Sequence, residues 1–549
     1  MAVLPPSVTA EAFASALSEF RAAVGADWVF TTDEDLHLYR DPTSLTWGTA
    51  EESVASAAVA PMTVEQVQAI VRVANKYKVP LFPISTGKNF AYGGPAPNLR
   101  GSVVVDLKRM SRILEVNEER NFALVEPGVT YFDLYRHIQE RGLKVWIDCA
   151  DVGWGGPMGN ALDRGMGYTL PFYRDHAGAS CGMEVVLANG DVIRTGTGAV
   201  PGSKTWQEYK HGYGPDPSGL FAQGNFGIVT KMGFRLMPQP EYCRTGLITV
   251  PKRQDLVPAV KILNYLSDSG FIGEIFFASP LRAFLDDPAF QALLDKPNGP
   301  ADEELDRFAA DHGVHSWMVE LQFYGPEKTC LANWEYAKER FTAAVSGAKF
   351  VEGESLKIPL SEEDLISKNS PFPPLNWHRK VTHGVANMTT WAQAYAPGRS
   401  ERNPNGEHRL HTGLFPVIPR SGEAIFEFQR VARQLSLEFG LSARDTPLRT
   451  PLSWPAFAYQ VAFPMPADES RAREAFVRII EVAAEHGWGD YRCPPPFQDM
   501  AVAAYSFGDH ALRKFRETLK DATDPNGILA PGRGGVWPKG FRQFRKTSA

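Results

Sequence analysis

The hydrophobic positions of the first 240 residues follow two patterns, short apolar runs of strand length and longer stretches with a helical period. Ala57–Ala60 and Leu81–Ile84 are two of the short runs. Between them, apolar residues recur on one helical face, at Val64, Val67, Ile70, Val71 and Ala74. Thr63, followed three residues later by Gln66, is a capping box that opens this helix. The pattern therefore predicts a compact β-α-β unit.

Further strands rich in β-branched residues extend this pattern to about residue 240. They are Val103–Leu107, Phe122–Glu126, Met183–Leu187 and Val192–Thr195. The sequence Asn189-Gly190-Asp191 between the last two is a hairpin turn signal. Because strands and helices are mixed without regular alternation, we predict an α+β fold rather than a uniform parallel sheet.

The pattern changes near Pro238-Gln239-Pro240, and long helices alternate with strands beyond it. The predicted helices are Leu256–Ser267, Cys330–Ala344, Ser421–Phe439 and Glu469–Glu485, and the predicted strands include Met318–Tyr324 and Tyr459–Phe463. Proline-rich loops at Ser370–Leu375 and Cys493–Pro496 interrupt this region. Long irregular loops inside a compact domain are often functional. We therefore divide the chain into a first domain, 1–240, and a second, 241–500.

A glycine-rich turn follows the strand at Leu81–Ile84. It reads Ser85-Thr86-Gly87-Lys88-Asn89, and a second glycine pair follows at Gly93-Gly94. Glycines permit positive φ and let a ligand approach bare N–H groups, which suits an anion such as pyrophosphate. The turn is not a Walker A loop, because Phe82 and Asn89 stand where that motif needs Gly and Ser or Thr, and no G-x-G-x-x-G follows a strand. From these residues alone, a phosphate-binding turn and a plain glycine-rich turn both remain open.

Composition limits the class of protein. With 549 residues the chain can form two or three domains, and its net charge of −6 favours neither nucleic acid nor an anionic membrane. The five cysteines form no C-x-x-C pair, which argues against a zinc site and a disulfide scaffold. No basic region precedes an apolar run at the N-terminus, and no apolar stretch reaches the roughly 18 residues of a membrane helix. We expect a cytoplasmic enzyme.

Four longer blocks resemble the flavoprotein family of vanillyl-alcohol oxidase, eugenol oxidase and the flavoprotein subunit of p-cresol methylhydroxylase. The blocks are Ile84–Gly94, Val125–Leu134, Gly219–Lys231 and Asp524–Arg533. They occur in the family's order and span about Ala57 to Trp537. The resemblance implies a two-part FAD-binding domain, formed by residues 1–240 and a returning segment 501–549, and an α+β cap domain over 241–500 for the substrate.

The same resemblance implies which residues bind FAD. They are Ile84, Ser85, Thr86, Gly87, Lys88, Asn89, Gly93, Gly156, Gly159, Asn160, Gly227, Ile228, Val229 and Arg533. His411 is the implied covalent link to the flavin, because it lies at the family's spacing before Tyr491 and shortly before a proline. His408 is the alternative, and a tyrosyl link through Tyr395 fits the spacing less well.

Tyr92, Tyr491 and Arg492 are candidates for binding a phenol. A guanidinium keeps its charge in any pocket, and tyrosine hydroxyls can donate to an oxyanion, so the three could lower a bound phenol's pKa. Matching residues in the family hold the substrate as a phenolate. The alternative is that Tyr491 and Arg492 end a strand and pair with a surface carboxylate.

Asp151 and Tyr168 are implied to lie near the reacting carbon. By position alone, Asp151 is an ordinary residue before a glycine-rich turn. The resemblance assigns Asp151, rather than Asp148, to a place near flavin N5 and the benzylic carbon, where a carboxylate can handle a proton. Tyr168 matches a tyrosine near the same site.

Two segments depart from the family's pattern. Ser453–Phe457 stands where vanillyl-alcohol and eugenol oxidases have a Met-His-His-type segment in the pocket wall. Thr43–Ser56 lacks the histidine that assists flavin attachment in vanillyl-alcohol oxidase. The first departure bears on substrate preference and the second on how the flavin is attached.

Taken together, the resemblance implies an FAD-dependent oxidase of para-substituted phenols such as vanillyl alcohol, syringyl alcohol, eugenol or 4-alkylphenols. Hydride would pass from the benzylic carbon to flavin N5, leaving a p-quinone methide, and oxygen would reoxidise the flavin with release of hydrogen peroxide. Two alternatives stay open, a dehydrogenase with a cytochrome c partner and a flavin-binding protein without turnover. We also expect a homodimer or higher homo-oligomer.

Overall fold

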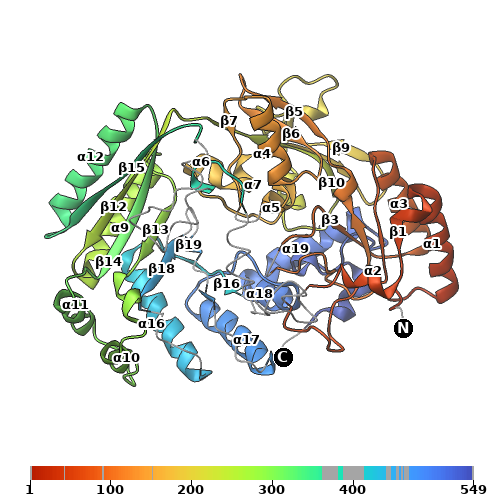
Figure 1. Cartoon of the computed structure of the whole chain (residues 1–549). Helices are drawn as coiled ribbons and strands as arrows, with labels where there is room; N and C mark the ends of the chain where they lie inside the picture. The colour runs from red at the N-terminus through yellow and green to blue at the C-terminus, as the bar shows by residue number, and fades with distance from the viewer. Residues whose placement is uncertain are drawn as a thin grey trace.

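Three larger β-sheets with helices packed around them organise the described part of the chain (Figure 1). The computed structural model describes residues 3–41, 44–89, 92–150, 153–360, 381–387, 413–440, 447–452, 457–458, 461–462 and 469–546. The mixture of parallel and antiparallel strands with helices confirms the predicted α+β class.

The first sheet contains the predicted β-α-β unit. Its strands lie in the order β1 (Val29–Phe30), β2 (Ala57–Val59), β4 (Val103–Asp106) and β3 (Leu81–Ile84). The last three are parallel, and β1 pairs antiparallel with β2. Helix α3 (Val64–Tyr77) connects β2 to β3 and packs against α1 (Ala10–Val24). Thr63 caps α3 by accepting the N–H of Gln66 at 3.3 Å, as predicted, whereas the Gln66 amide oxygen accepts from Met62 rather than from Thr63.

The second sheet is antiparallel. Its strands lie in the order β5 (Ile113–Asn117), β6 (Phe122–Val125), β10 (Ile228–Arg235), β8 (Ser180–Val186) and β9 (Val192–Arg194). Strands β8 and β9 form the predicted hairpin, in which Gly190 has a φ of +86° and donates to the Leu187 carbonyl. Helix α4 (Tyr131–Glu140) buries Leu134 and Ile138 in the core beneath this sheet.

The third sheet, also antiparallel, begins just after the change in pattern at Pro240. Its strands lie in the order β15 (Lys349–Lys357), β12 (Tyr242–Val250), β14 (Trp317–Gly325), β13 (Ile275–Ala278) and β18 (Arg449–Leu452). The helices α9 (Leu256–Asp268), α12 (Glu327–Ala344), α16 (Gly422–Glu438) and α17 (Glu469–Glu485) share one apolar core with it. Trp317 and Trp334 are fully buried there. Of the predicted strand Tyr459–Phe463, only the part in β20 (Val461–Ala462) lies within the described residues.

The other described helices and strands lie outside the three larger sheets and the helices already named. The remaining helices are α2 (Asp33–His37), α5 (Pro157–Leu162), α6 (Pro171–Arg174), α7 (His176–Ala179), α8 (Ser218–Phe221), α10 (Pro288–Leu294), α11 (Asp302–Asp311), α18 (Gln498–Ala503) and α19 (Phe507–Thr523), and the remaining strands are β7 (Val145–Trp146), β11 (Met237–Pro238), β16 (Gly413–Leu414), β17 (Val417–Ile418) and β19 (Phe457–Ala458). Among the described helices, none has the length and apolar character needed to cross a membrane.

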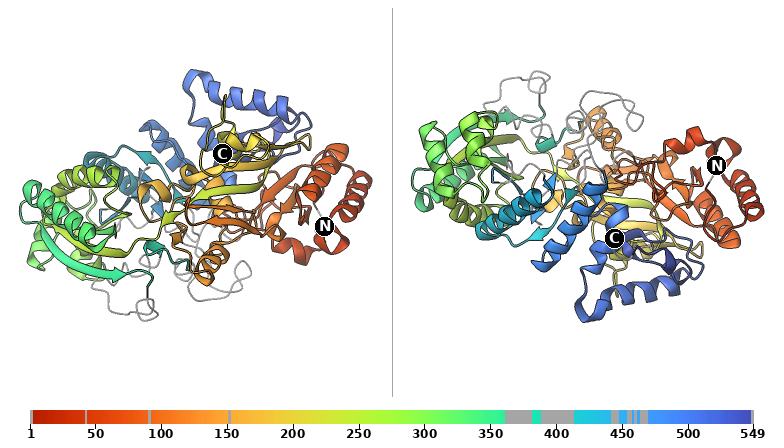
Figure 2. Two further views of the ribbon diagram at one scale, coloured as in Figure 1. Left: turned by 90° about the horizontal axis from the view of Figure 1, so that it is seen from above. Right: turned by 90° about the horizontal axis from the view of Figure 1, so that it is seen from below.

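The arrangement brings the end of the chain back to its beginning. Figures 1 and 2 show the first sheet with α1 and α3 at one end of the molecule and the third sheet at the other, with the second sheet and α19 between them. Leu529, which follows α19, forms a parallel bridge with Leu81 of β3. The glycine-rich turn after β3 therefore lies beside the C-terminal segment.

Candidate functional site

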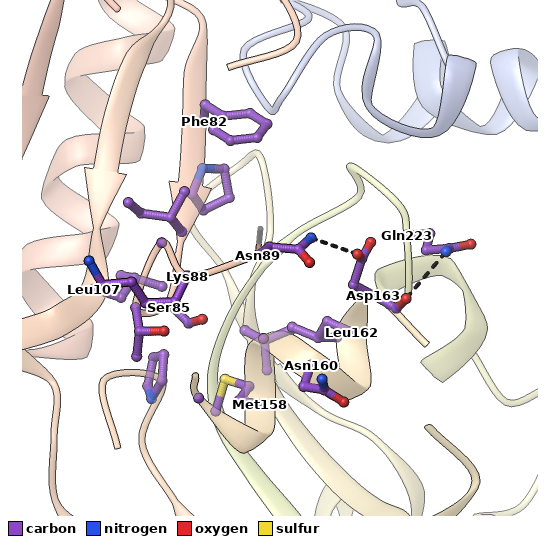
Figure 3. A pocket seen from close by; sticks show the side chains of 18 of the residues that line it. Phe82, Ser85, Lys88, Asn89, Leu107, Met158, Asn160, Leu162, Asp163 and Gln223 are labelled. Carbon is purple, nitrogen blue, oxygen red and sulfur yellow. Dashed lines mark hydrogen bonds between the residues drawn. The ribbon is translucent and has the colours of Figure 1, made fainter. Parts of the chain in front are cut away.

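A cavity opens where the turn after β3 meets α5 and the C-terminal segment (Figure 3). Twelve of the fourteen predicted cofactor residues line it, namely Ile84, Ser85, Thr86, Gly87, Lys88, Asn89, Gly156, Gly159, Asn160, Gly227, Val229 and Arg533. The other two, Gly93 and Ile228, are not part of the lining, whereas Gly94 is. These residues come from four segments far apart in the sequence, which converge on one cavity.

The backbone around this cavity fits a group that lies against bare peptide. Gly87 has a φ of +66°, which favours glycine. A Cβ at Gly159 would lie 2.1 Å from Ser85 Oγ, so the two segments approach too closely for a side chain there. Within the described part of the chain, the N–H groups of Thr86 to Asn89 have no intramolecular acceptor. Free N–H donors on a glycine turn suit the pyrophosphate of a dinucleotide such as FAD.

The three residues predicted to hold a phenol come together where this cavity adjoins a second one, which is lined by Tyr491 and Arg492 and shares Asp163 and Arg533 with the first. The guanidinium carbon of Arg492 lies 4.0 Å from the centre of the Tyr92 ring. Phe415 lies between the two tyrosines, with ring centres 5.4 Å from Tyr92 and 6.0 Å from Tyr491. Tyr92 also lines the cavity. An aromatic group entering from the cavity would meet aromatic side chains and one cation.

Protonation states follow from burial and from neighbouring charges. Burial raises the pKa of both Tyr92 and Tyr491, so each stays a neutral hydroxyl donor. Burial opposes the charge of Arg492, but the carboxylate of Asp163, which accepts a hydrogen bond from the guanidinium, acts against this, and the pKa of Arg492 is raised. The site therefore carries a permanent cation beside two neutral hydroxyls.

Asp163 is a component of the site that the sequence did not predict. It follows α5, is buried, and its Oδ2 accepts from Asn89 Nδ2 at 2.6 Å (Figure 3) and from Arg492 Nε at 3.2 Å. Its Oδ1 pairs with Arg533. Gln223 donates to the carbonyls of both Asp163 and Tyr491, at 3.3 and 2.8 Å. No spacing signal links these residues, because they come from distant parts of the chain.

Tyr168 belongs to a second buried network. Its N–H donates to Asp148 at 3.0 Å, and Asp148 also contacts His176 Nε2 at 3.0 Å. The other ring nitrogen of His176 lies 2.5 Å from Asn160 Oδ1, in the cavity wall. Asp148, which the sequence did not single out for chemistry, thus ties Tyr168 to the cavity through His176 and Asn160.

Several predicted residues lie outside the described part of the chain. These are Asp151 and the two histidines His408 and His411. Their roles remain predictions from the sequence.

Of the cysteines, Cys149, Cys181, Cys243 and Cys330 are buried free thiols and Cys493 is half-buried.

Comparison with known proteins shows which sequences this chain resembles. The sequence family described as FAD binding domain matches residues 55–196. The chain is 34% identical over 543 residues to the 4-cresol dehydrogenase [hydroxylating] flavoprotein subunit of Pseudomonas putida, covering 97% of this chain and 98% of that protein. It is 28% identical over 553 residues to the 1'-carboxy-chondrochloren decarboxylase of Chondromyces crocatus, covering 94% and 96% of the two chains.

Two solved structures share the fold of this chain over nearly its whole length. The structure of 4-ethylphenol oxidase from Gulosibacter chungangensis, in complex with isoeugenol, superposes with a TM-score of 0.77 at 33% identity, covering 98% of this chain and all of that one. The structure of p-cresol methylhydroxylase with substrate bound superposes with a TM-score of 0.78 at 32% identity, covering 98% of this chain and 99% of that one. With near-complete coverage at this identity, the chain belongs to the flavoprotein family of vanillyl-alcohol oxidase and p-cresol methylhydroxylase.

Proposed function

We propose that this protein is an FAD-dependent oxidoreductase that oxidises para-substituted phenols at the benzylic carbon. The observation that carries the proposal is the stacking of the Arg492 guanidinium on Tyr92, with Tyr491 nearby, at the edge of the glycine-lined cavity. The named activities of its relatives, 4-cresol dehydrogenase and 4-ethylphenol oxidase, agree with this substrate class.

The protein's own residues would prepare the phenol for reaction. Tyr92 and Tyr491 donate to the phenolic oxygen, and Arg492 balances its negative charge, so the phenol binds as a phenolate. That charge pushes electron density toward the para carbon and favours departure of hydride from the benzylic position. Bound FAD would supply the hydride acceptor, and oxygen would then take up the electrons to give hydrogen peroxide.

We assign proton handling near the benzylic carbon to Asp151, with Tyr168 close by. After hydride departure, the quinone methide adds water or tautomerises, and either outcome needs a proton acceptor or donor. Asp151→Ala should therefore slow anaerobic flavin reduction by about 10²-fold or more, the usual scale for a positioned acid or base. Reduction at the wild-type rate would remove Asp151 from this role.

We also propose that FAD is covalently attached through His411, with His408 as the alternative. The His411 imidazole would hold the flavin by a bond to its C8-methyl carbon; the methyl group and the imidazole would each lose a proton, and the two electrons released would stay on the flavin until oxygen took them up. Acid-precipitated wild-type protein should then remain yellow, and His411→Ala should release its flavin under the same treatment. A colourless wild-type pellet would contradict attachment, and a yellow pellet from the variant would move the assignment to His408.

The decisive experiment for the substrate class is a survey of oxygen uptake. The purified holoenzyme would be tested against vanillyl alcohol, syringyl alcohol, eugenol and 4-ethylphenol, with peroxide measured alongside. We expect turnover with at least one of them. Flavin reduction without oxygen uptake would favour the second candidate, a dehydrogenase with a cytochrome partner. The name of the Pseudomonas putida relative, a dehydrogenase flavoprotein subunit, supports the dehydrogenase part of this candidate. No flavin reduction by any phenol would contradict the proposal.

A further inference from the structure

Asp163 is the point at which three distant parts of the chain meet beside the cavity. Its carboxylate binds Asn89 from the turn after β3, Arg492 from the loop after α17, and Arg533 from the C-terminal segment. The side chain is only 8% exposed, and both of its oxygens are engaged. A carboxylate held in this way has one defined orientation.

The contact with Arg492 determines how that guanidinium is presented. Asp163 occupies the Nε edge of Arg492, while Asn89 Oδ1 accepts from Nη2 at 3.0 Å. The guanidinium face lies over the Tyr92 ring. Because the guanidinium donates hydrogen bonds at both ends to residues of the cavity wall, the charge of Arg492 is preorganised without a phenol present.

The contact with Arg533 determines how much of the positive charge of Arg492 is left unneutralised by Asp163. One buried carboxylate faces two guanidiniums, so Asp163 cannot neutralise both. The nearby Asp490 has a pKa that burial raises to about 7, and its Oδ1 accepts from the backbone N–H of Arg492 rather than from the guanidinium. The cluster thus retains a partial positive charge that a phenolate can balance.

We propose that Asp163 is a positioning residue that sets how strongly the site favours the ionised form of its phenol, by fixing Arg492 and dividing its own charge between Arg492 and Arg533. This inference rests on the proposed function. Removing the negative charge of Asp163 would leave more positive potential on the phenolate and promote ionisation. Without Arg533, the Asp163 carboxylate would pair with Arg492 alone and neutralise more of its charge, which would oppose ionisation of the phenol.

The test is a spectroscopic titration of bound 4-nitrophenol, which is strongly coloured only as the phenolate and has no benzylic hydrogen to lose. In Asp163→Asn the apparent pKa of the bound phenol should fall by about one unit or more, the scale of one charge at close range in a partly buried site. In Arg533→Gln it should rise by a similar amount. Asp163→Glu keeps the charge and should return the value toward that of the wild type.

A purely structural role predicts different results. A loosened pocket would raise the bound phenol's pKa toward its solution value in every variant, including Asp163→Asn. An unchanged or raised value in Asp163→Asn would overturn the inference, and if that variant does not fold, an unchanged or lowered value in Arg533→Gln would overturn it instead. If the wild type binds 4-nitrophenol as the phenolate and the variants do not change the apparent pKa of the bound phenol, only this inference is refuted. If the wild type shows no phenolate signal, the proposed function is contradicted as well.

Discussion

Arg492 combines two properties that a phenolate site needs, a permanent charge and a fixed position. The permanent charge could be predicted from the sequence, since Tyr92 stands in a block that resembles a known family and the Tyr491-Arg492 pair matches residues that hold the substrate in that family. Asp163 was not predicted, because its partners Arg492 and Arg533 lie 329 and 370 residues away along the chain. Contacts of that kind depend on the whole fold and leave no local pattern to find.

At the same scale, Asp490 makes stability depend on pH. Burial raises its pKa to about 7, above the ordinary value of about 4 that it would have in the unfolded chain. Between these values the folded state holds a proton that the unfolded state has released, so stability falls as pH rises through this range. We expect Asp490→Asn, which keeps an oxygen to accept the N–H of Arg492, to be more stable than the wild type at pH 8, on the order of 1 kcal/mol.

The measurement is the melting temperature of both proteins across the pH range. The advantage of Asp490→Asn should shrink as pH falls from 7 toward about 4, and below that value the wild-type carboxyl is protonated in both states. Asp216 offers a control of opposite sign, since its bonds to Ser218 and His211 outweigh burial and lower its pKa. The stabilising contribution of Asp216 is present above its ordinary pKa of about 4 and is lost as pH falls below it, so Asp216→Asn should be less stable than the wild type above about pH 4 and approach it in stronger acid. An Asp490 advantage that does not vary with pH would contradict the assignment.

At the scale of elements, the turn after β3 lines the cavity mainly with backbone groups rather than with side chains. Local signals predicted this part well, because the capping of α3 by Thr63 and the hairpin at Gly190 depend on neighbouring residues alone. The local signals did not show why this turn contains so many glycines. In the structure, α5 lies close to the turn, with Gly159 against Ser85, and the two segments enclose a cavity lined by bare backbone.

This view predicts that Gly87→Ala lowers FAD content. A Cβ at a φ of +66° costs about 1–2 kcal/mol of backbone strain, and it would also approach Pro95 to 3.2 Å, so the turn must shift. Gly142 has a similar φ of +63° with no atom near its Cβ, and it lies away from the cavity lining. Absorbance should show several-fold less FAD per chain in Gly87→Ala and near wild-type content in Gly142→Ala. Equal losses in the two variants would mean that strain alone explains the effect.

At the scale of the whole molecule, a buried ion pair within the C-terminal segment holds a lysine that also binds the cavity side through the Asn225 carbonyl. Lys520 of α19 is fully buried, pairs with Asp524 at 2.7 Å, and donates to the carbonyls of Asn225 and Leu529. Leu529 in turn pairs with β3. The return of the chain was implied by family resemblance. The strand orders were not predicted, since β4 lies between β2 and β3 only through pairing that is distant in sequence.

Lys520→Met should therefore be strongly destabilising. It leaves the Asp524 carboxylate buried with only the N–H groups of Ile528 and Leu529, and an uncompensated buried charge of this kind costs about 3–5 kcal/mol. Urea denaturation would measure the loss. The double variant Lys520→Met, Asp524→Asn removes both charges and should recover part of it. A single variant within about 1 kcal/mol of the wild type would show that the pair does not stabilise the segment.

The central claim concerns the whole molecule as an enzyme, that activity requires a free phenol para to the reacting carbon. Two hydroxyl donors and one permanent cation suit a phenolate and have no comparable use with a neutral ether. Hydrogen bonds to a charged group are worth about 1.5–3 kcal/mol each, so losing three of them should slow reaction by about 10³-fold or more. Arg492→Met should weaken phenol binding and slow reduction together, because the same charge acts on both.

The most direct measurement is anaerobic stopped-flow reduction of the holoenzyme by vanillyl alcohol and by its O-methylated analogue, which keeps the ring and the benzylic alcohol but cannot ionise. We predict rapid reduction by the free phenol and reduction slower by about 10³-fold or more with the ether, while a phenol without a reactive side chain binds and competes. Reduction by the ether at a rate comparable to that of the free phenol would contradict the phenolate mechanism.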